Sequence, residues 1–182
     1  MLEIRFHSRG GQGGVVAGKL LSVALFKEGV NVQAFPAFGV ERRSAPVMAF
    51  VRMDDQPIRI RTQIYNPDHI VILDQSLPQM IDVTLGLKSG ATILINSEKK
   101  PEDFNFGDAF NVVTVDASSI AVKHGLGSVT QPIVNTAILG AIAKVLKIVK
   151  IESVVDAIKE ESPAKAEENA AAALEAFEMV EG

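Results

Sequence analysis

The beginning of the chain predicts a β-strand, a glycine-rich turn and an α-helix in direct succession. Apolar and polar residues alternate over residues 2–6, the pattern of a strand with one buried face. Residues 8–13 are rich in glycine, and residues 15–28 carry apolar side chains at helical spacing. Gly29 is a suitable C-cap, because glycine adopts the left-handed conformation that ends many helices. A strand that enters a helix through such a turn is typical of α/β proteins.

The rest of the chain continues this alternation. Further strands are expected at residues 30–35, 47–53, 58–60, 70–73, 91–96 and 112–115. Helices are expected at residues 77–87, 118–124, 132–147, 151–158 and 165–180. The turn residues 54–57 separate two of the strands and predict a hairpin. We therefore expect a single α/β domain over residues 1–182, with three α/β/α layers and a largely parallel, Rossmann-like sheet that contains an antiparallel hairpin insertion.

Composition excludes several classes of protein. The net charge of −4 argues against a general nucleic-acid binder, which needs a positive field to hold phosphates. The chain has no cysteine, so it offers no disulfide, no iron–sulfur ligand and no thiol nucleophile. Its longest apolar stretch, residues 133–149, is interrupted by an asparagine and two lysines and falls short of a membrane span. With no signal-peptide pattern at the start, we expect a cytoplasmic protein that contacts neither membrane nor nucleic acid.

Positive charge is concentrated in the first third of the chain. All seven arginines lie between Arg5 and Arg61. Residues 1–61 carry a net charge of +4, whereas residues 62–182 carry −8. Because the planar guanidinium suits carboxylates and phosphates, the first third is where an anion or an acidic partner is expected. A merely solvated polar surface is the alternative.

The glycine turn is the first candidate site. It consists of Arg9, Gly10, Gly11, Gln12 and Gly13. Backbone N–H groups at such a turn, together with the dipole of the following helix, favour an anion. A tight strand-to-helix turn without a ligand explains the glycines equally well.

Two known phosphate-binding loops do not fit this turn. A dinucleotide fingerprint that starts at Gly11 would need glycine where Val16 stands. A P-loop over residues 13–20 would need serine or threonine at Leu20, to bind magnesium. Lys19 is also expected inside the helix, so we interpret the P-loop match as a coincidence.

A second candidate site lies in the loop after the strand at residues 30–35. Residues 36–46 hold Glu41, Arg42 and Arg43 between two prolines. Loops at the carboxyl ends of strands line the binding crevices of α/β sheets, so these residues could meet an anion or a partner. A local salt bridge is the alternative.

No catalytic or metal-binding group is expected in this chain. Its three histidines, His7, His69 and His124, lack metal-ligand spacing. Asp74 and Asp116 each follow a strand, where a carboxylate can either serve a site or cap a helix.

Several segments in this order resemble one known family. They are Arg9-Gly10-Gly11-Gln12-Gly13, Gln33-Ala34-Phe35-Pro36, Phe38-Gly39-Val40-Glu41-Arg42-Arg43, Ala45-Pro46-Val47, Pro67-Asp68, Val71-Ile72-Leu73-Asp74, Pro132-Ile133-Val134-Asn135-Thr136 and Leu139-Gly140. Together they are similar to the gamma subunit of 2-oxoacid:ferredoxin oxidoreductases, whose substrates include pyruvate, 2-ketoisovalerate and 2-oxoglutarate. The same unit is one internal domain of the single-chain pyruvate enzymes.

The resemblance implies one part of an enzyme that oxidatively decarboxylates a 2-oxoacid to an acyl-CoA and reduces ferredoxin. Thiamine diphosphate, magnesium and iron–sulfur clusters are then expected in alpha, beta and ferredoxin-like delta partner subunits, with CoA as co-substrate. This chain would be inactive alone and would contribute to assembly and to the surroundings of CoA through the two candidate sites. A free-standing phosphate- or nucleotide-binding protein and a pure interaction scaffold are the alternatives.

Four positions depart from the family's usual pattern. The family more often has glycine where Ser8 stands and valine where Gly14 stands. It also usually has proline at the position of Val40 and glycine at that of Ser44.

Overall fold

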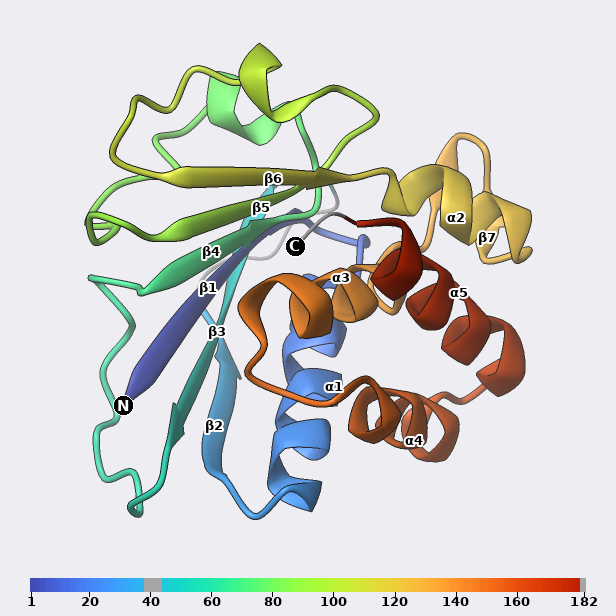
Figure 1. Ribbon diagram of the computed structural model, residues 1–182, viewed down its shortest axis with the longest axis horizontal. Helices are drawn as coiled ribbons and strands as arrows, with labels where there is room; N and C mark the ends of the chain where they lie inside the picture. Colours follow the sequence, from blue (N-terminus) through green and yellow to red (C-terminus); the bar gives the residue numbers. More distant parts are fainter. Residues whose placement is uncertain (38–43, 181–182) are drawn as a thin grey trace.

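The computed structural model describes residues 1–37 and 44–180, and within them six strands form one sheet in the order β2-β3-β1-β4-β5-β6 (Figure 1). The strands are β1 (Leu2–Arg9), β2 (Asn31–Pro36), β3 (Pro46–Asp54), β4 (His69–Ile72), β5 (Thr92–Asn96) and β6 (Asn111–Val115). The pairs β1–β4, β4–β5 and β5–β6 are parallel, whereas β3 pairs antiparallel with both β1 and β2. The predicted α/β class and largely parallel sheet are therefore confirmed.

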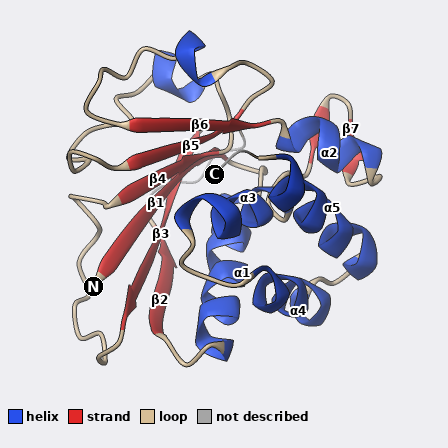
Figure 2. Cartoon of the chain, in the orientation of Figure 1, coloured by secondary structure: helices blue, strands red, loops and turns tan. Residues whose placement is uncertain are grey.

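The α-helices gather on one face of the sheet (Figure 2). They are α1 (Gly14–Lys27), α2 (Ala117–Lys123), α3 (Ala137–Leu146), α4 (Ile151–Glu161) and α5 (Ala166–Met179). Their apolar sides pack on the residues that the strands point toward this face, among them Ile4, Phe6 and Val51. Across the described residues, no helix combines the length and the apolar character that a membrane crossing requires.

In the described ranges the other face of the sheet carries no α-helix, so the expected α/β/α arrangement has α-helices in only one of its two outer layers. A smaller core of Ile70, Ile72, Ile93 and Ile95 lies here under two 3-10 helices, η1 (Leu77–Gln79) and η2 (Pro101–Asp103), and the turns around them. The expected helix at residues 77–87 is wrong beyond its first turn. The carboxylate of Asp82 accepts hydrogen bonds from the backbone N–H and the hydroxyl of Thr84, a local arrangement that competes with helical bonding.

The predicted hairpin between residues 47–53 and 58–60 is also wrong. The first segment is β3, but it pairs with β2 and β1, and residues 58–60 form no strand. The side chain of Arg52 instead donates to the carbonyl of Ile60 at 3.5 Å and, just beyond this segment, to those of Thr62 at 2.9 Å and Gln63 at 3.3 Å. The antiparallel part of the sheet is therefore made by β2 and β3.

The helix expected from Pro132 begins five residues later, at Ala137. Pro132 belongs instead to a short antiparallel pair, β7 (Gly127–Ser128) and β8 (Gln131–Pro132). The N–H of Ile133 donates to the carbonyl of Leu126, which extends this pairing and delays the helix. The hairpin that results borders the candidate site described below.

Two helices of the helical layer touch backbone to backbone. The Cα of Gly140 in α3 lies so close to the carbonyl of Ala173 in α5 that an added Cβ would overlap the oxygen. Gly18 in α1 has room, because an added Cβ would lie 3.4 Å from Cγ2 of Val51, an ordinary contact.

We expect Gly140→Ala to lower the free energy of unfolding by about 1–3 kcal/mol, because α3 and α5 must separate to admit the methyl group. Gly18→Ala is the matched control. It should be neutral or should stabilise by up to about 1 kcal/mol, since alanine is the better helix former. Urea unfolding of the purified chains measures both, and equal effects would contradict the proposed backbone contact.

A buried histidine lies beside a buried arginine on the face without α-helices. His7 is 2% exposed and its Nε2 accepts a hydrogen bond from Nε of Arg5 at 3.0 Å. The same arginine donates to the carbonyls of Val83 and Leu85, which fastens the turn that covers the sheet. Burial, with the neighbouring positive charge, lowers the pKa of His7 to about 3.

The low pKa of His7 makes stability depend on pH. In the unfolded chain the imidazole takes up a proton below about pH 6.5, whereas the folded chain excludes it down to about 3. The unfolding free energy should therefore decrease as the pH is lowered from about 6.5 toward about 3. In His7→Gln, whose amide oxygen can still accept from Arg5, that contribution should be absent. Denaturation at pH 7 and 4.5 should show the wild-type advantage shrinking by on the order of 2–3 kcal/mol, and a constant difference would refute the assignment.

Candidate functional site

The glycine turn lies where β1 ends and α1 begins. Its backbone is fixed by pairing with the end of the second loop: the N–H of Gly10 donates to the carbonyl of Ala45 at 2.9 Å, and the N–H of Ser44 donates back at 3.1 Å. Gly11 and Gly13 have φ values of 98° and 81°, in the left-handed region that favours glycine. The structure thus joins the two loops that the sequence analysis treated as separate candidates.

The side chain of Arg9 is engaged within the protein. Its Nε donates to Oδ2 of Asp74 at 2.8 Å, and one Nη donates to the hydroxyl of Ser76 at 2.8 Å. The other Nη donates to the carbonyl of Ser44 at 3.0 Å. Arg9 therefore anchors the turn to the end of β4 and to the end of the second loop.

Gln12 completes this anchor. Its Oε1 accepts from the backbone N–H of Arg9 at 2.8 Å, and its Nε2 donates to Oδ2 of Asp74 at 2.9 Å. Burial alone would raise the pKa of Asp74, but hydrogen bonds from Ser76 and Gln12 and the charge of Arg9 outweigh it, and the pKa is lowered. Asp74 is therefore ionised at neutral pH. The sequence showed only that this aspartate follows a strand, and its partners lie 62 and 65 residues away.

A cavity of about 610 Å³ opens beside the turn. One wall is the turn itself, from Arg9 to Gln12, together with Ser44. The opposite wall is the β7–β8 hairpin, which contributes Ser128, Thr130 and Gln131. This wall was not expected from the sequence, because Pro132 was predicted to open a helix and lies instead in β8. Hydroxyl, amide and backbone donors on both sides suit a polar or anionic ligand.

The start of α1 adds to the attraction for an anion. Within the described residues, no side chain caps its N-terminus and its first turn contains no acidic residue. No capping side chain among these residues thus accepts from the free N–H groups that carry the partial positive charge of the helix end. Gly13 is pressed against Asn135, because an added Cβ would lie 2.8 Å from Nδ2. A larger residue at this position would have to push Asn135 aside and adopt the positive φ of 81° that favours glycine.

A second, polar cavity of about 290 Å³ lies on the other side of Gln12. It is formed at the ends of β4, β5 and β6 by Asp74, Asn96 and Asp116. Asp116 caps α2 by accepting from the N–H of Ser119 at 2.9 Å, which confirms the capping alternative. In the part of the chain that the structure describes, no three acidic, histidine or cysteine residues are placed to hold a metal ion.

The remaining predicted site residues, Glu41, Arg42 and Arg43, lie outside the described residues. The two residues of the P-loop match that would bind a nucleotide and its metal are engaged elsewhere. Lys19 lies inside α1 and donates to Glu161 at 2.6 Å, while Leu20 is buried in the core. The match is therefore a coincidence, as expected.

Two of the departures from the family pattern compensate for each other. An added Cβ on Gly14 would overlap both the hydroxyl and the Cβ of Ser8. With serine at position 8, only glycine fits at position 14. With glycine at position 8, the more usual arrangement, space opens for a valine. The two exchanges are therefore sterically complementary.

A double-mutant cycle tests this compensation. Gly14→Val alone should destabilise the chain by about 1–3 kcal/mol, because the valine cannot avoid Ser8. Adding Ser8→Gly should recover most of the loss, and Ser8→Gly alone is the control for the lost hydroxyl. Urea unfolding gives the coupling free energy. Additive effects would show that the two positions do not share this space.

Comparison with known proteins places this geometry in a family. The sequence profile of the family described as "Pyruvate ferredoxin/flavodoxin oxidoreductase" matches residues 3–179. The "Pyruvate/ketoisovalerate oxidoreductases common subunit gamma" of Thermococcus kodakarensis is 56% identical over 97% of this chain and 96% of its own. The "Pyruvate synthase subunit PorC" of Methanothermobacter thermautotrophicus is 50% identical over 100% of this chain and 97% of its own.

A solved structure agrees with both sequence relatives. The crystal structure of the pyruvate oxidoreductase subunit PORC of Thermotoga maritima superposes with a TM-score of 0.84 at 32% identity. The superposition covers 99% of this chain and 97% of that one. The chain therefore belongs to the pyruvate ferredoxin/flavodoxin oxidoreductase family, as its motifs predicted.

Proposed function

We propose that this chain is the gamma subunit of a multi-subunit 2-oxoacid:ferredoxin oxidoreductase, which converts a 2-oxoacid and CoA to an acyl-CoA and reduces ferredoxin. The observation that carries the proposal is the nearly complete mutual coverage with chains that are themselves named as subunits. Pyruvate and ketoisovalerate, which occur in the name of one relative, are the substrates to test first.

The electron-transfer and thiamine chemistry belongs to partner subunits in this proposal. The chain has no cysteine, so it cannot supply the thiolates that hold iron–sulfur clusters. Thiamine diphosphate, magnesium and the clusters would be bound by alpha, beta and ferredoxin-like delta subunits. The gamma subunit would assemble with them and shape the approach of CoA.

The cavity beside the glycine turn is our candidate for the CoA approach. Arg9 and Gln12 act as positioning residues here, because their side chains are bound to Asp74 and hold the turn in shape. The N–H groups of Gly10 and Gln12 donate to the carbonyls of Ala45 and Arg9, so the backbone N–H of Gly11 and the hydroxyls of the β7–β8 hairpin would contact the polyanionic co-substrate. Glu41, Arg42 and Arg43 belong to the same loop as Ser44, which lines this cavity, and are proposed to contact CoA or a partner subunit.

The alternative of a free-standing nucleotide-binding protein has little support. Its P-loop would need Lys19 and a hydroxyl at position 20, but the lysine pairs with Glu161 and Leu20 is buried.

Charge placed in the cavity tests the role in CoA binding. We expect Thr130→Glu to raise the KM for CoA about tenfold with little change in kcat, because the new carboxylate repels phosphate groups. Val129→Glu is the matched control, because Val129 is exposed in the same hairpin as Thr130 but does not line the cavity. Thr130→Gln controls for size.

The measurement is CoA-dependent dye reduction with pyruvate or ketoisovalerate, using complex purified anaerobically through a tag on this chain. A thiamine-binding and a cluster-bearing subunit should be recovered with it. Recovery of the chain alone, without activity, would overturn the proposed subunit role. An intact complex in which Thr130→Glu and Val129→Glu behave alike would overturn only the assignment of the cavity.

A further inference from the structure

A basic segment crosses the face of the sheet that has no α-helices. We call residues 58–65, between β3 and β4, the strap. Arg52, which is only 1% exposed, binds the strap from the side of the sheet. The guanidinium donates to carbonyls of the strap at Thr62 and Gln63, and forms an ion pair with Glu3 at 2.6 Å.

The aromatic ring of Phe35 also packs against this arginine. The guanidinium carbon of Arg52 lies over the ring, 5.5 Å from its centroid. A buried arginine with a carboxylate, an aromatic face and several carbonyl acceptors has one defined orientation. The strap is irregular in secondary structure, but it is held in one course by these contacts.

The outer side of the strap carries two exposed arginines. Arg59 and Arg61 are exposed, and neither forms an ion pair with any residue in the ranges 1–37 and 44–180. Ile60 between them is 43% exposed and Tyr65 at the end of the strap is 66% exposed. Arginine and tyrosine are the residue types enriched at the centres of protein interfaces.

An apolar hollow of about 740 Å³ adjoins the strap. Its lining includes Met48, Phe50, Ile64 and Tyr65, and Leu85 stands at its edge with 69% of its surface exposed. A basic strip beside an apolar depression has the composition of a protein interface, with an apolar centre and a charged rim. Because Arg52 and Arg5 already hold the surrounding segments, little conformational entropy would be lost on binding.

We propose that the strap and this hollow form the docking surface for another subunit of the same enzyme, whose contacting patch is acidic around an apolar centre. The charge of the strap selects this partner, since this chain supplies no carboxylate to Arg59 or Arg61 in its described part. The inference rests on the proposed function for the identity of the partner. It goes beyond that function in naming the face that is used.

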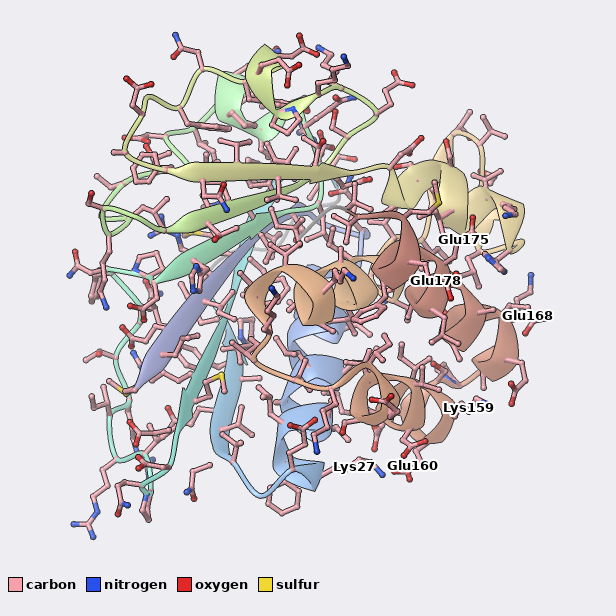
Figure 3. The ribbon with its side chains drawn as sticks, in the orientation of Figure 1. Lys27, Lys159, Glu160, Glu168, Glu175 and Glu178 are labelled. Atoms are coloured by element: carbon pink, nitrogen blue, oxygen red, sulfur yellow. The ribbon has the colours of Figure 1, made fainter. Side chains whose placement is uncertain are left out.

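A second copy of this chain fits the surface less well. The acidic side chains Glu160, Glu168 and Glu178 project from α4 and α5, on the helical side of the sheet (Figure 3). A copy that offered these residues to the strap would bind head to tail, an arrangement that closes only as a ring. Nucleic acid is disfavoured by the net charge of −4.

Charge reversal on the strap tests the inference in the assembled enzyme. Partner subunits recovered from the dissociated native complex are mixed with equal amounts of wild-type and variant chain, and the incorporated fractions are measured by mass spectrometry. Arg59→Glu with Arg61→Glu should be incorporated about tenfold less than wild type, because like charges would face each other. Lys147→Glu with Lys150→Glu is the matched control: it makes the same change in charge on the helical side, and its incorporation should equal that of wild type.

The outcomes separate this inference from the proposed function. If wild-type chain fails to join any partner subunit, the proposed function is wrong. If wild type assembles and the strap variant assembles equally well, the docking surface is wrong while the function stands. A photo-crosslinking residue at Tyr65 should label an Asp- and Glu-rich peptide of a partner subunit. A crosslink to a second copy of this chain, or to a basic peptide, would overturn the inference.

Discussion

The side chains of β1 alternate between the two faces of the sheet, and the two sides of the molecule differ accordingly. Ile4 and Phe6 point toward the α-helices and are completely buried there. The residues between them, Arg5 and His7, point to the opposite face, which is covered by turns and irregular segments. Because β1 lies between β3 and β4, this alternation decides which face is apolar enough to carry helices. At its end the same strand delivers Arg9 to the glycine turn.

Three arginines serve as internal fasteners. Arg5 holds the turn at residues 83–85, Arg9 holds the glycine turn and Arg52 holds the strap. In each case the arginine donates to backbone carbonyls far along the chain that are in neither helix nor strand. These side-chain hydrogen bonds satisfy carbonyls that regular secondary structure leaves unpaired. Burying such charges costs free energy unless hydrogen bonds satisfy them, and each of the three has several. The cluster of arginines in the sequence is therefore explained partly by architecture.

This division of roles matters for function. The side chain of Arg9 lines the cavity but already donates to Asp74, Ser76 and Ser44, so its first role is to hold the turn. For an anion, the turn offers the backbone N–H of Gly11, a helix end that no side chain of the described residues caps, and the facing hairpin. A subunit that holds no cluster can still influence a reaction by fixing the geometry of a cavity and by presenting a rigid surface to its partners. The cavity and the strap are separate features of the fold, one beside the glycine turn and the other across the face without α-helices.

The sequence by itself determined the local pattern: the alternation of strands, the helix after the glycine turn, and the family through the order of its motifs. These features depend on residues close together in the chain, where periodicity and glycine placement act directly. Only the tertiary structure decided which distant groups meet. Asp74 joins Arg9 across 65 residues, Ser8 and Gly14 share one space, and Arg52 draws residues 58–63 away from the predicted hairpin. The helix expected at residues 77–87 was wrong for a local and a distant reason: Asp82 binds Thr84 two residues on, and Arg5 binds the carbonyls of Val83 and Leu85 from the sheet.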